Sequence, residues 1–280
     1  MRSVLQVVSI VHMGMTHKCG LARACHDHQT WRCMSLPRVL YTYVMLGATE
    51  TTFMNNTATD FGGDVGVAGA AVVNIYSASF TGSTAKGGGA LFVHGAAKLS
   101  INDCDISRGA AGDGHGGCVA AEDDAVLQIV GTKMSGCSIR DGCGGAIGAR
   151  QRVKVEVINS TISSTTASLG GAVCLFHNAT AQVHGTQFLE NTASDGAAVY
   201  ADGNATVIVQ SSGFADNRAN RWGGAIFATT QAQVKVLPST PGWCWAIRRQ
   251  MAGHMHAPLH LAHIVCACGM HTWWAHHPWG

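Results

Sequence analysis

Charged residues and proline are scarce in this sequence, and neither a long basic run nor a long apolar run is present. Of the 280 residues, 12% are charged and 5 are proline, whereas 35 are glycine. The formal net charge is +2 and no cluster of Lys and Arg suited to a phosphate backbone occurs, so nucleic acid is not an expected partner. No apolar stretch reaches the roughly 18 residues of a membrane-spanning helix. The excess of glycine instead favours a repetitive β architecture.

A pair of glycines followed by Ala and an aliphatic residue recurs through the middle of the chain. The four full copies are Gly88-Gly89-Ala90-Leu91, Gly144-Gly145-Ala146-Ile147, Gly170-Gly171-Ala172-Val173 and Gly223-Gly224-Ala225-Ile226. The degenerate copies begin at Gly62, Gly116 and Gly196. Successive first glycines are therefore 26, 28, 28, 26, 26 and 27 residues apart. We number each copy from its first glycine, which is position 0.

Four further positions agree across the copies without adjustment. Position 3 holds Val65, Leu91, Val119, Ile147, Val173, Val199 and Ile226, and position 11 holds Val73, Leu99, Leu127, Val155, Ala181, Val207 and Val234. Position 13 holds Ile75, Ile101, Ile129, Val157, Val183, Val209 and Val236. Position 18 holds Phe80, Ile106, Met134, Ile162, Phe188 and Phe214. All except Ala181 are large and apolar. Apolar residues two apart follow the strand period, so each copy predicts three short strands separated by turns.

Stacking these copies would pair each strand with its counterpart in the next copy and enclose one core. The sequence thus predicts an all-β fold, a single right-handed parallel β-helix solenoid of about seven coils over residues 44–237; the handedness follows from the bias of parallel crossovers. Residues 1–43 form an irregular leader whose start is a weak signal-like segment. Residues 238–280 form a tail rich in His, Trp and Cys, interpreted as a cap, a disordered segment or an extension of the gene model.

The repeat resembles that of the polymorphic outer membrane proteins, because Gly-Gly-Ala-aliphatic occurs in phase with Phe-x-x-Asn. The second motif is present as Phe188-Leu189-Glu190-Asn191 and Phe214-Ala215-Asp216-Asn217. Other coils carry Ser83, Gly109, Cys137 and Thr165 where that family has Asn. The resemblance covers residues 44–237 and implies a right-handed, pectin-lyase-like β-helix exposed at a cell surface and used in adhesion.

Structural roles account for the motif residues in physical terms. Glycine permits tight turns and close approach of the neighbouring coil, which we expect at Gly88, Gly89, Gly144, Gly145, Gly170, Gly171, Gly223 and Gly224. Phe188 and Phe214 should fill a corner of the core. Asn191 and Asn217, one coil apart, should form a side-chain ladder.

A catalytic alternative arises because some parallel β-helices cleave polysaccharides with paired carboxylates. The candidate residues are Glu122, Asp123 and Asp124, together with His115. Gly114-His115-Gly116 resembles a short motif of the polygalacturonases, although the other motifs of that family are missing. The structural alternative is a solvated acidic turn between two strands.

Metal sites are possible in two places, and no cofactor is otherwise expected. Asp103, Asp105 and Asp123 could supply oxygen ligands to Ca²⁺ from stacked coils. The tail contains imidazole and thiol groups suited to Zn²⁺ or Ni²⁺, in a spacing that fits no familiar closed site: His254, His256, His260, His263, Cys266 and Cys268. An accidental run of His codons is the competing explanation.

The cysteines of the repeat suggest no ladder of disulfides. Cys104, Cys118, Cys137, Cys143 and Cys174 occupy five different coil positions, whereas bridges between stacked coils would need equal ones. Most of the eleven cysteines are therefore predicted to be free thiols.

The function predicted from these features is non-catalytic binding of carbohydrate or of a cell-surface or matrix protein through the β-helix faces, in an adhesin-like manner. The expected location is extracellular or at the cell surface. The alternatives are a pectin-lyase-like polysaccharide lyase or hydrolase, and a fragment of a longer solenoid.

Overall fold

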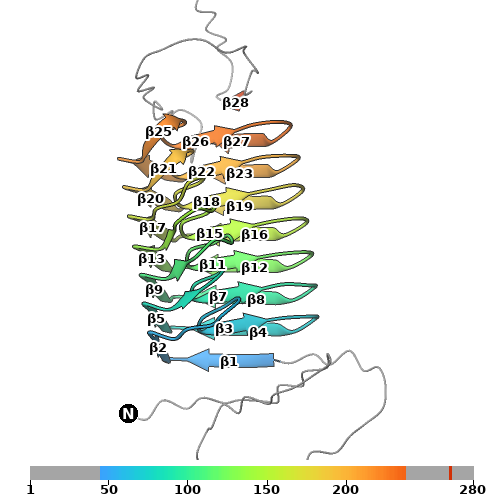
Figure 1. Ribbon diagram of the computed structural model, residues 1–280. Coiled ribbons are helices and arrows are strands. Elements are labelled where there is room, and N and C mark those ends of the chain that lie inside the picture. Colours follow the sequence, from blue (N-terminus) through green and yellow to red (C-terminus); the bar gives the residue numbers. More distant parts are fainter. Residues whose placement is uncertain (1–44, 238–264, 267–280) are drawn as a thin grey trace, which may run out of the picture.

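The computed structural model describes residues 45–237 and 265–266, and in this part of the chain it forms a parallel β-solenoid (Figure 1). Every regular element of these residues is a strand. The coils stack one above another, so that strands about 27 residues apart in sequence are neighbours in space. Predictions for the leader lie outside the described residues, as do those for the tail apart from Val265 and Cys266.

The strands of successive coils form three long sheets and a fourth, interrupted one, which we number in the order in which a coil meets them. The first sheet contains β3 (Val65–Val67), β7 (Leu91–Val93), β11 (Val119–Ala121), β15 (Ile147–Ala149), β18 (Val173–Leu175), β22 (Val199–Ala201) and β26 (Ile226–Ala228). The second contains β1 (Met45–Thr49), β4 (Val72–Tyr76), β8 (Lys98–Asn102), β12 (Val126–Val130), β16 (Lys154–Ile158), β19 (Thr180–His184), β23 (Thr206–Gln210), β27 (Gln233–Leu237) and β28 (Val265–Cys266).

The third sheet contains β2 (Thr52–Met54), β5 (Ser79–Thr81), β9 (Asp105–Ser107), β13 (Lys133–Ser135), β17 (Thr161–Ser163), β20 (Gln187–Leu189) and β24 (Gly213–Ala215). The fourth consists of β6 (Thr84–Ala85), β10 (Ala110–Ala111) and β14 (Ser138–Ile139), and separately of β21 (Thr192–Asp195) and β25 (Arg218–Trp222). The predicted three strands per coil are thus joined by a fourth short one, whose residues show no apolar alternation long enough to be recognised in the sequence.

The pairing register confirms the alignment of the copies. Leu99 is paired with Val73 in the coil before it and with Leu127 in the coil after it. Because side chains alternate across a strand, positions 11 and 13 both face inward in every coil, and the residues between them face solvent. The second sheet therefore contributes two continuous rows of aliphatic side chains to one core.

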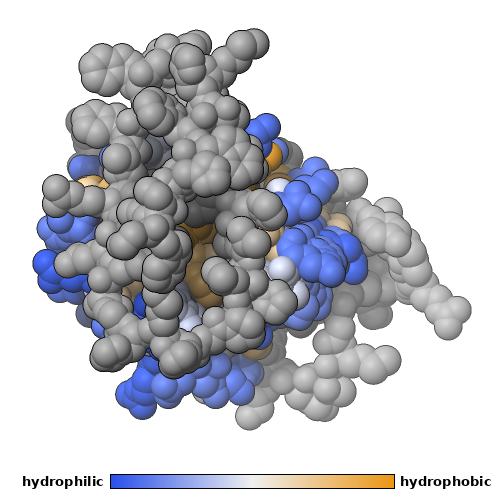
Figure 2. All heavy atoms as spheres, turned by 90° about the horizontal axis from the view of Figure 1, so that it is seen from above, coloured by the Kyte–Doolittle hydropathy of each residue, from blue (hydrophilic) through white to orange (hydrophobic). Residues whose placement is uncertain are grey.

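The core fills the inside of the coils, and polar residues surround it. Viewed down the solenoid from the end where β27 lies, hydrophilic residues form the rim (Figure 2). At position 18 the side chains of Ile106, Met134 and Phe188 are 0% exposed. Phe188 and Phe214 stack with ring centroids 4.9 Å apart and an interplanar angle of 7°. The corner role predicted for these two rings is confirmed, since stacked coils place like residues face to face.

The double glycine is explained by two separate constraints, as Gly144 and Gly145 show. Gly144 has φ of +76°, and a Cβ there would collide with the carbonyl oxygen of Ile147, which closes the turn. A Cβ on Gly145 would instead collide with the carbonyl oxygen of Gly171 in the next coil. Position 0 therefore needs glycine for its own turn, and position 1 needs it because coils pack about 4.8 Å apart.

Two ladders of polar side chains connect the coils at buried corners. Asn191 Nδ2 donates to Asn217 Oδ1 at 2.9 Å and also to the carbonyl of Ile162 at 3.1 Å, which confirms the predicted asparagine ladder. A second ladder at position 16 was not predicted. There the backbone N–H of Thr132 donates to Ser160 Oγ at 3.2 Å, and Ser160 N–H donates to Thr186 Oγ1 at 3.4 Å.

The prediction that most of the eleven cysteines are free thiols is wrong for four of the five cysteines in the repeat, which form two disulfides. Cys118 is bonded to Cys137 and Cys143 to Cys174, with Cα atoms 5.5 and 5.6 Å apart. Both bridges join unequal coil positions: position 2 to position 21 of the copy that begins at Gly116, and the residue before Gly144 to position 4 of the copy that begins at Gly170. Cys104 remains a buried free thiol.

Candidate functional site

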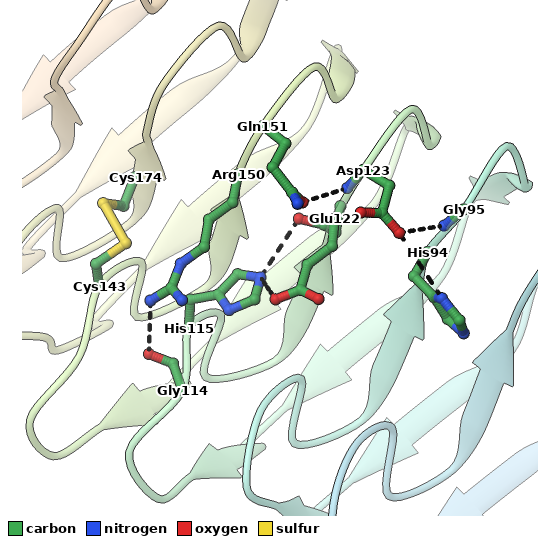
Figure 3. A network of polar contacts seen from close by, with 11 residues as sticks. His94, Gly95, Gly114, His115, Glu122, Asp123, Cys143, Arg150, Gln151 and Cys174 are labelled. Atoms are coloured by element: carbon green, nitrogen blue, oxygen red, sulfur yellow. Dashed lines mark hydrogen bonds and ion pairs between the residues drawn. A yellow bond between two sulfur atoms is a disulfide. The ribbon is translucent and has the colours of Figure 1, made fainter.

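The acidic turn, residues Glu122–Asp124, joins β11 to β12 at the corner between the first and second sheets. Asp123 adopts φ of +64°, which suits a residue that closes a tight turn. Its carboxylate accepts the backbone N–H of Gly95 at 3.1 Å, and its own N–H donates to Gln151 Oε1 at 2.7 Å (Figure 3). Asp123 thus connects the corners of three successive coils, which favours the structural alternative, a solvated acidic turn, over a catalytic role.

Asp124 is engaged with Arg152 at the same corner of the following coil. The guanidinium donates to both carboxylate oxygens, at 2.6 and 2.7 Å. These hydrogen bonds hold the pKa of Asp124 below its usual value, so the carboxylate stays ionised at neutral pH. A carboxylate that is ionised and accepts two hydrogen bonds from a guanidinium cannot serve as the acid that protonates a leaving group.

His115 lies beneath the acidic turn and is 1% exposed. Its Nε2 lies 3.3 Å from the carbonyl oxygen of Ala121 and 3.5 Å from Glu122 Oε1 (Figure 3). The loop that carries it packs against the outer side of β15, where a Cβ on Gly148 would lie 2.9 Å from His115 Cβ. The imidazole is therefore enclosed because the strand opposite it has no side chain at that point.

The electrostatics of this enclosure keep His115 neutral. Burial, and to a lesser degree the positive charge of Arg150, lower its pKa to about 4, although the hydrogen bond with the carbonyl of Ala121 opposes both effects. The nearby Glu122 side chain is 29% exposed and partly hydrated, whereas the imidazole has lost nearly all contact with water. Among the described residues, His115 Nδ1 has no hydrogen-bond partner. The ring is a buried, neutral group closed off from solvent.

Of the four candidate catalytic residues, only His115 and Glu122 are brought into contact with each other. A shallow groove lies elsewhere, along the fourth sheet, and it contains one charged residue and no carboxylate. Its lining is Ala110, Ala111, Gly112, Ser138, Ile139, Arg140, Thr166 and Ala167. The pair of acids that glycoside hydrolysis requires is therefore not found in this groove.

The three aspartates considered for Ca²⁺ do not converge. Asp103 and Asp105 flank the corner between the second and third sheets, whereas Asp123 lies at the opposite end of the second sheet. Within residues 45–237 and 265–266, no three His, Cys, Asp or Glu side chains are placed to hold one metal ion. The tail ligands His254, His256, His260, His263 and Cys268 lie outside the described residues, and only the backbone of Cys266 is described.

The outer side of the second sheet is the broadest regular surface, and we call it the polar face. It is formed by positions 10, 12 and 14, the outward partners of the aliphatic rows. Its central row, position 12, contains Asn74, Ser100, Gln128, Glu156, Gln182, Ile208 and Lys235. The outward alternation in the sequence could have located this row once positions 11 and 13 were assigned to the core.

Hydrogen bonds run along the polar face from coil to coil. Gln128 Nε2 donates to Glu156 Oε2 at 2.8 Å, and Ser100 Oγ donates to Gln128 Oε1 at 3.4 Å. These bonds use only part of the capacity of each amide and carboxylate, because an amide has two donors and two acceptor lone pairs. Donors and acceptors therefore remain available to a ligand lying across the strands.

Comparison with known proteins gives one match. The family model described as the right handed beta helix region matches residues 90–240. No curated protein and no solved structure matches the chain. In the described part of the chain, no helix is long and apolar enough to cross a membrane.

Proposed function

The chain belongs to the right-handed beta helix family, and from this premise we propose that it is a non-catalytic, adhesin-like protein that binds carbohydrate across its polar face. The family is compatible both with surface binding and with action on polysaccharides. The choice between the two rests on the residues of this chain. Binding is favoured because Asp123 and Asp124 are engaged in turns, while the polar face offers unused hydrogen-bonding groups.

The row at position 12 is the observation that carries the proposal. Amide, hydroxyl and carboxylate groups follow one another there at the spacing of paired strands, about 4.8 Å. Such groups, held by their own hydrogen bonds, suit a linear polymer that presents hydroxyls at regular intervals. A protein partner would be expected to bind a surface with buried aromatic anchors, which this central row lacks.

An extracellular or cell-surface location is part of the proposal. Two disulfides within the repeat support it, because such bonds persist in oxidising compartments and are rare in the cytosol. The resemblance to polymorphic outer membrane protein repeats points the same way. That closer relationship remains a prediction, carried by the motifs at Asn191 and Asn217.

A glycan array and a polygalacturonate-cleavage assay on the purified full chain, each with and without Ca²⁺, test the proposal together. We expect saturable glycan binding by the wild-type chain. Affinity should weaken about tenfold in a Gln128→Ala, Glu156→Ala double variant, because two or three hydrogen bonds to the glycan are lost. Gln187→Ala is the matched control, since this amide is exposed on the third sheet instead.

Two results would overturn the proposal. Absence of any glycan binding by the wild-type chain would remove the carbohydrate ligand and leave a protein partner as the explanation for the polar face. New unsaturated or reducing ends, lost in an Asp123→Ala, Asp124→Ala double variant, would make the protein a polysaccharide enzyme.

A further inference from the structure

An exposed tryptophan lies far from the polar face, at the end of β25. The Trp222 side chain is 55% exposed, although tryptophan is usually well buried. Its indole stacks on Phe227, with ring centroids 5.5 Å apart and an interplanar angle of 25°. Phe227 in turn packs on Tyr200 at 5.9 Å, and Tyr200 on Phe176 at 5.8 Å. The indole is thus oriented by a row of aromatic rings along the outer side of the first sheet.

A buried carboxylate next to this row has unused hydrogen-bonding capacity. The Asp195 side chain is 4% exposed, and its Oδ2 accepts a hydrogen bond from Arg221 Nη2. Its other oxygen, Oδ1, is buried and has no hydrogen-bond partner among the described residues. A buried acceptor without a partner is costly, which makes Oδ1 an attractive point for a donor.

The side chain that pairs with this carboxylate, Arg221, is itself exposed to solvent. The Arg221 side chain is 57% exposed, and its guanidinium carbon lies 5.4 Å from the centroid of the Trp222 ring. The guanidinium therefore contacts both the buried carboxylate and the exposed indole. Tyr200 adds a phenol that stays protonated, because burial and the nearby Asp202 and Asp195 charges raise its pKa.

These groups match the chemistry of a sugar ring. A pyranose has an apolar face of C–H groups, which packs on an aromatic ring, and vicinal hydroxyls, which can donate to a carboxylate and accept from a guanidinium. We propose that Trp222, Arg221 and Asp195 form a second subsite, which holds a single neutral pyranose residue of a glycan. The ligand class is that of the proposed function, but the subsite lies on the first-sheet side of the solenoid and stands on different residues.

The subsite is tested by calorimetric titration of the full chain with neutral oligosaccharides of glucose, xylose, mannose and N-acetylglucosamine. Trp222→Ala should weaken binding about tenfold, and Trp222→Phe should retain most of it because a ring remains. Phe61→Ala is the control, since Phe61 is another exposed aromatic residue, 39% exposed, which precedes Gly62 as Trp222 precedes Gly223 and lies outside the polar face. Thermal unfolding of each variant verifies that the fold is kept.

The outcomes separate this subsite from the polar face. Wild-type affinity in Trp222→Ala, with loss in the Gln128→Ala, Glu156→Ala variant, would overturn the subsite and leave the proposed function intact. Loss in Trp222→Ala alone would establish the subsite and refute the polar face as the binding surface. Failure of the wild-type chain to bind any of the four oligosaccharide series would overturn the subsite as stated.

Discussion

Acid should destabilise this protein through His115, and the size of the effect follows from its enclosure. The pKa of His115 is about 4 in the folded chain and 6.5 when the side chain is solvated, so the two states differ by about 2.5 pH units. Each unit corresponds to about 1.4 kcal/mol, which gives about 3 kcal/mol of stability that depends on this one proton.

The sign follows from which state binds the proton first. As pH falls below 6.5, the unfolded chain becomes protonated at His115 while the folded chain, with its pKa of about 4, does not. Stability contributed by the neutral ring is therefore present at pH 7, declines between pH 6.5 and 4, and is gone below pH 4. The loss should be nearly linear with pH across most of this window.

Urea unfolding at pH 7, 6, 5 and 4 measures the effect when the wild-type chain is compared with His115→Gln. Gln does not titrate, so subtracting the two curves removes the contribution of the carboxylates. We expect the wild-type chain to lose about 3 kcal/mol more than the variant between pH 7 and 4. His184→Gln, an exposed histidine on the second sheet, should behave like the wild type. A difference below about 1 kcal/mol between wild type and His115→Gln would refute the enclosure argument.

Three further predictions concern the repeat itself. Gly144→Ala should destabilise the solenoid by at least about 2 kcal/mol in urea unfolding, because the left-handed turn and the collision with a carbonyl oxygen both oppose a Cβ. Gly66→Ala is the control and should be nearly neutral, because a Cβ there meets no atom within 4 Å. Equal effects of the two substitutions would contradict the explanation of the motif. Asn191→Ala should lower the unfolding free energy, measured in urea, by about 2–4 kcal/mol, since it leaves buried hydrogen-bond partners unsatisfied in two neighbouring coils. A loss below about 1 kcal/mol would show that the ladder contributes little. Reducing the disulfides should lower the melting temperature. For the bridge between Cys118 and Cys137, separated by 19 residues, chain entropy predicts that the double serine variant loses about 3 kcal/mol of unfolding free energy in denaturation. Unchanged stability of this variant would argue that the bond does not form.

The parts of the fold that were predicted correctly depend on residues at equal coil positions. Val73, Leu99 and Leu127 pair as expected because strands of stacked coils meet at the same position. The asparagine ladder was found for the same reason, since its two members are one coil apart. The ladder at position 16 obeys the same rule but was missed, because Ser160 and Thr186 carry no sequence motif that distinguishes them from turn residues.

The candidate site could not be judged from the sequence, because its contacts join unequal positions. His115 is enclosed only because Gly148, in the neighbouring strand β15, has no side chain, and nothing near His115 in the sequence indicates this. Asp123 was recognised as a potential ligand or catalyst from its charge. Its carboxylate accepts the N–H of Gly95 and its own N–H donates to Gln151, so the residue is engaged in the turns of two other coils.

The sequence by itself determined the period, the inward rows and hence the β-helix, because a solenoid repeats one local pattern and each coil buries the same positions against its neighbours. Only the tertiary structure decided which cysteines pair, that His115 is neutral and enclosed, and that Asp195 lies beside Trp222. These features depend on how turns of different length fold over the outer side of a sheet. Such contacts are set by packing in space, for which the spacing of residues along the chain has no fixed signature.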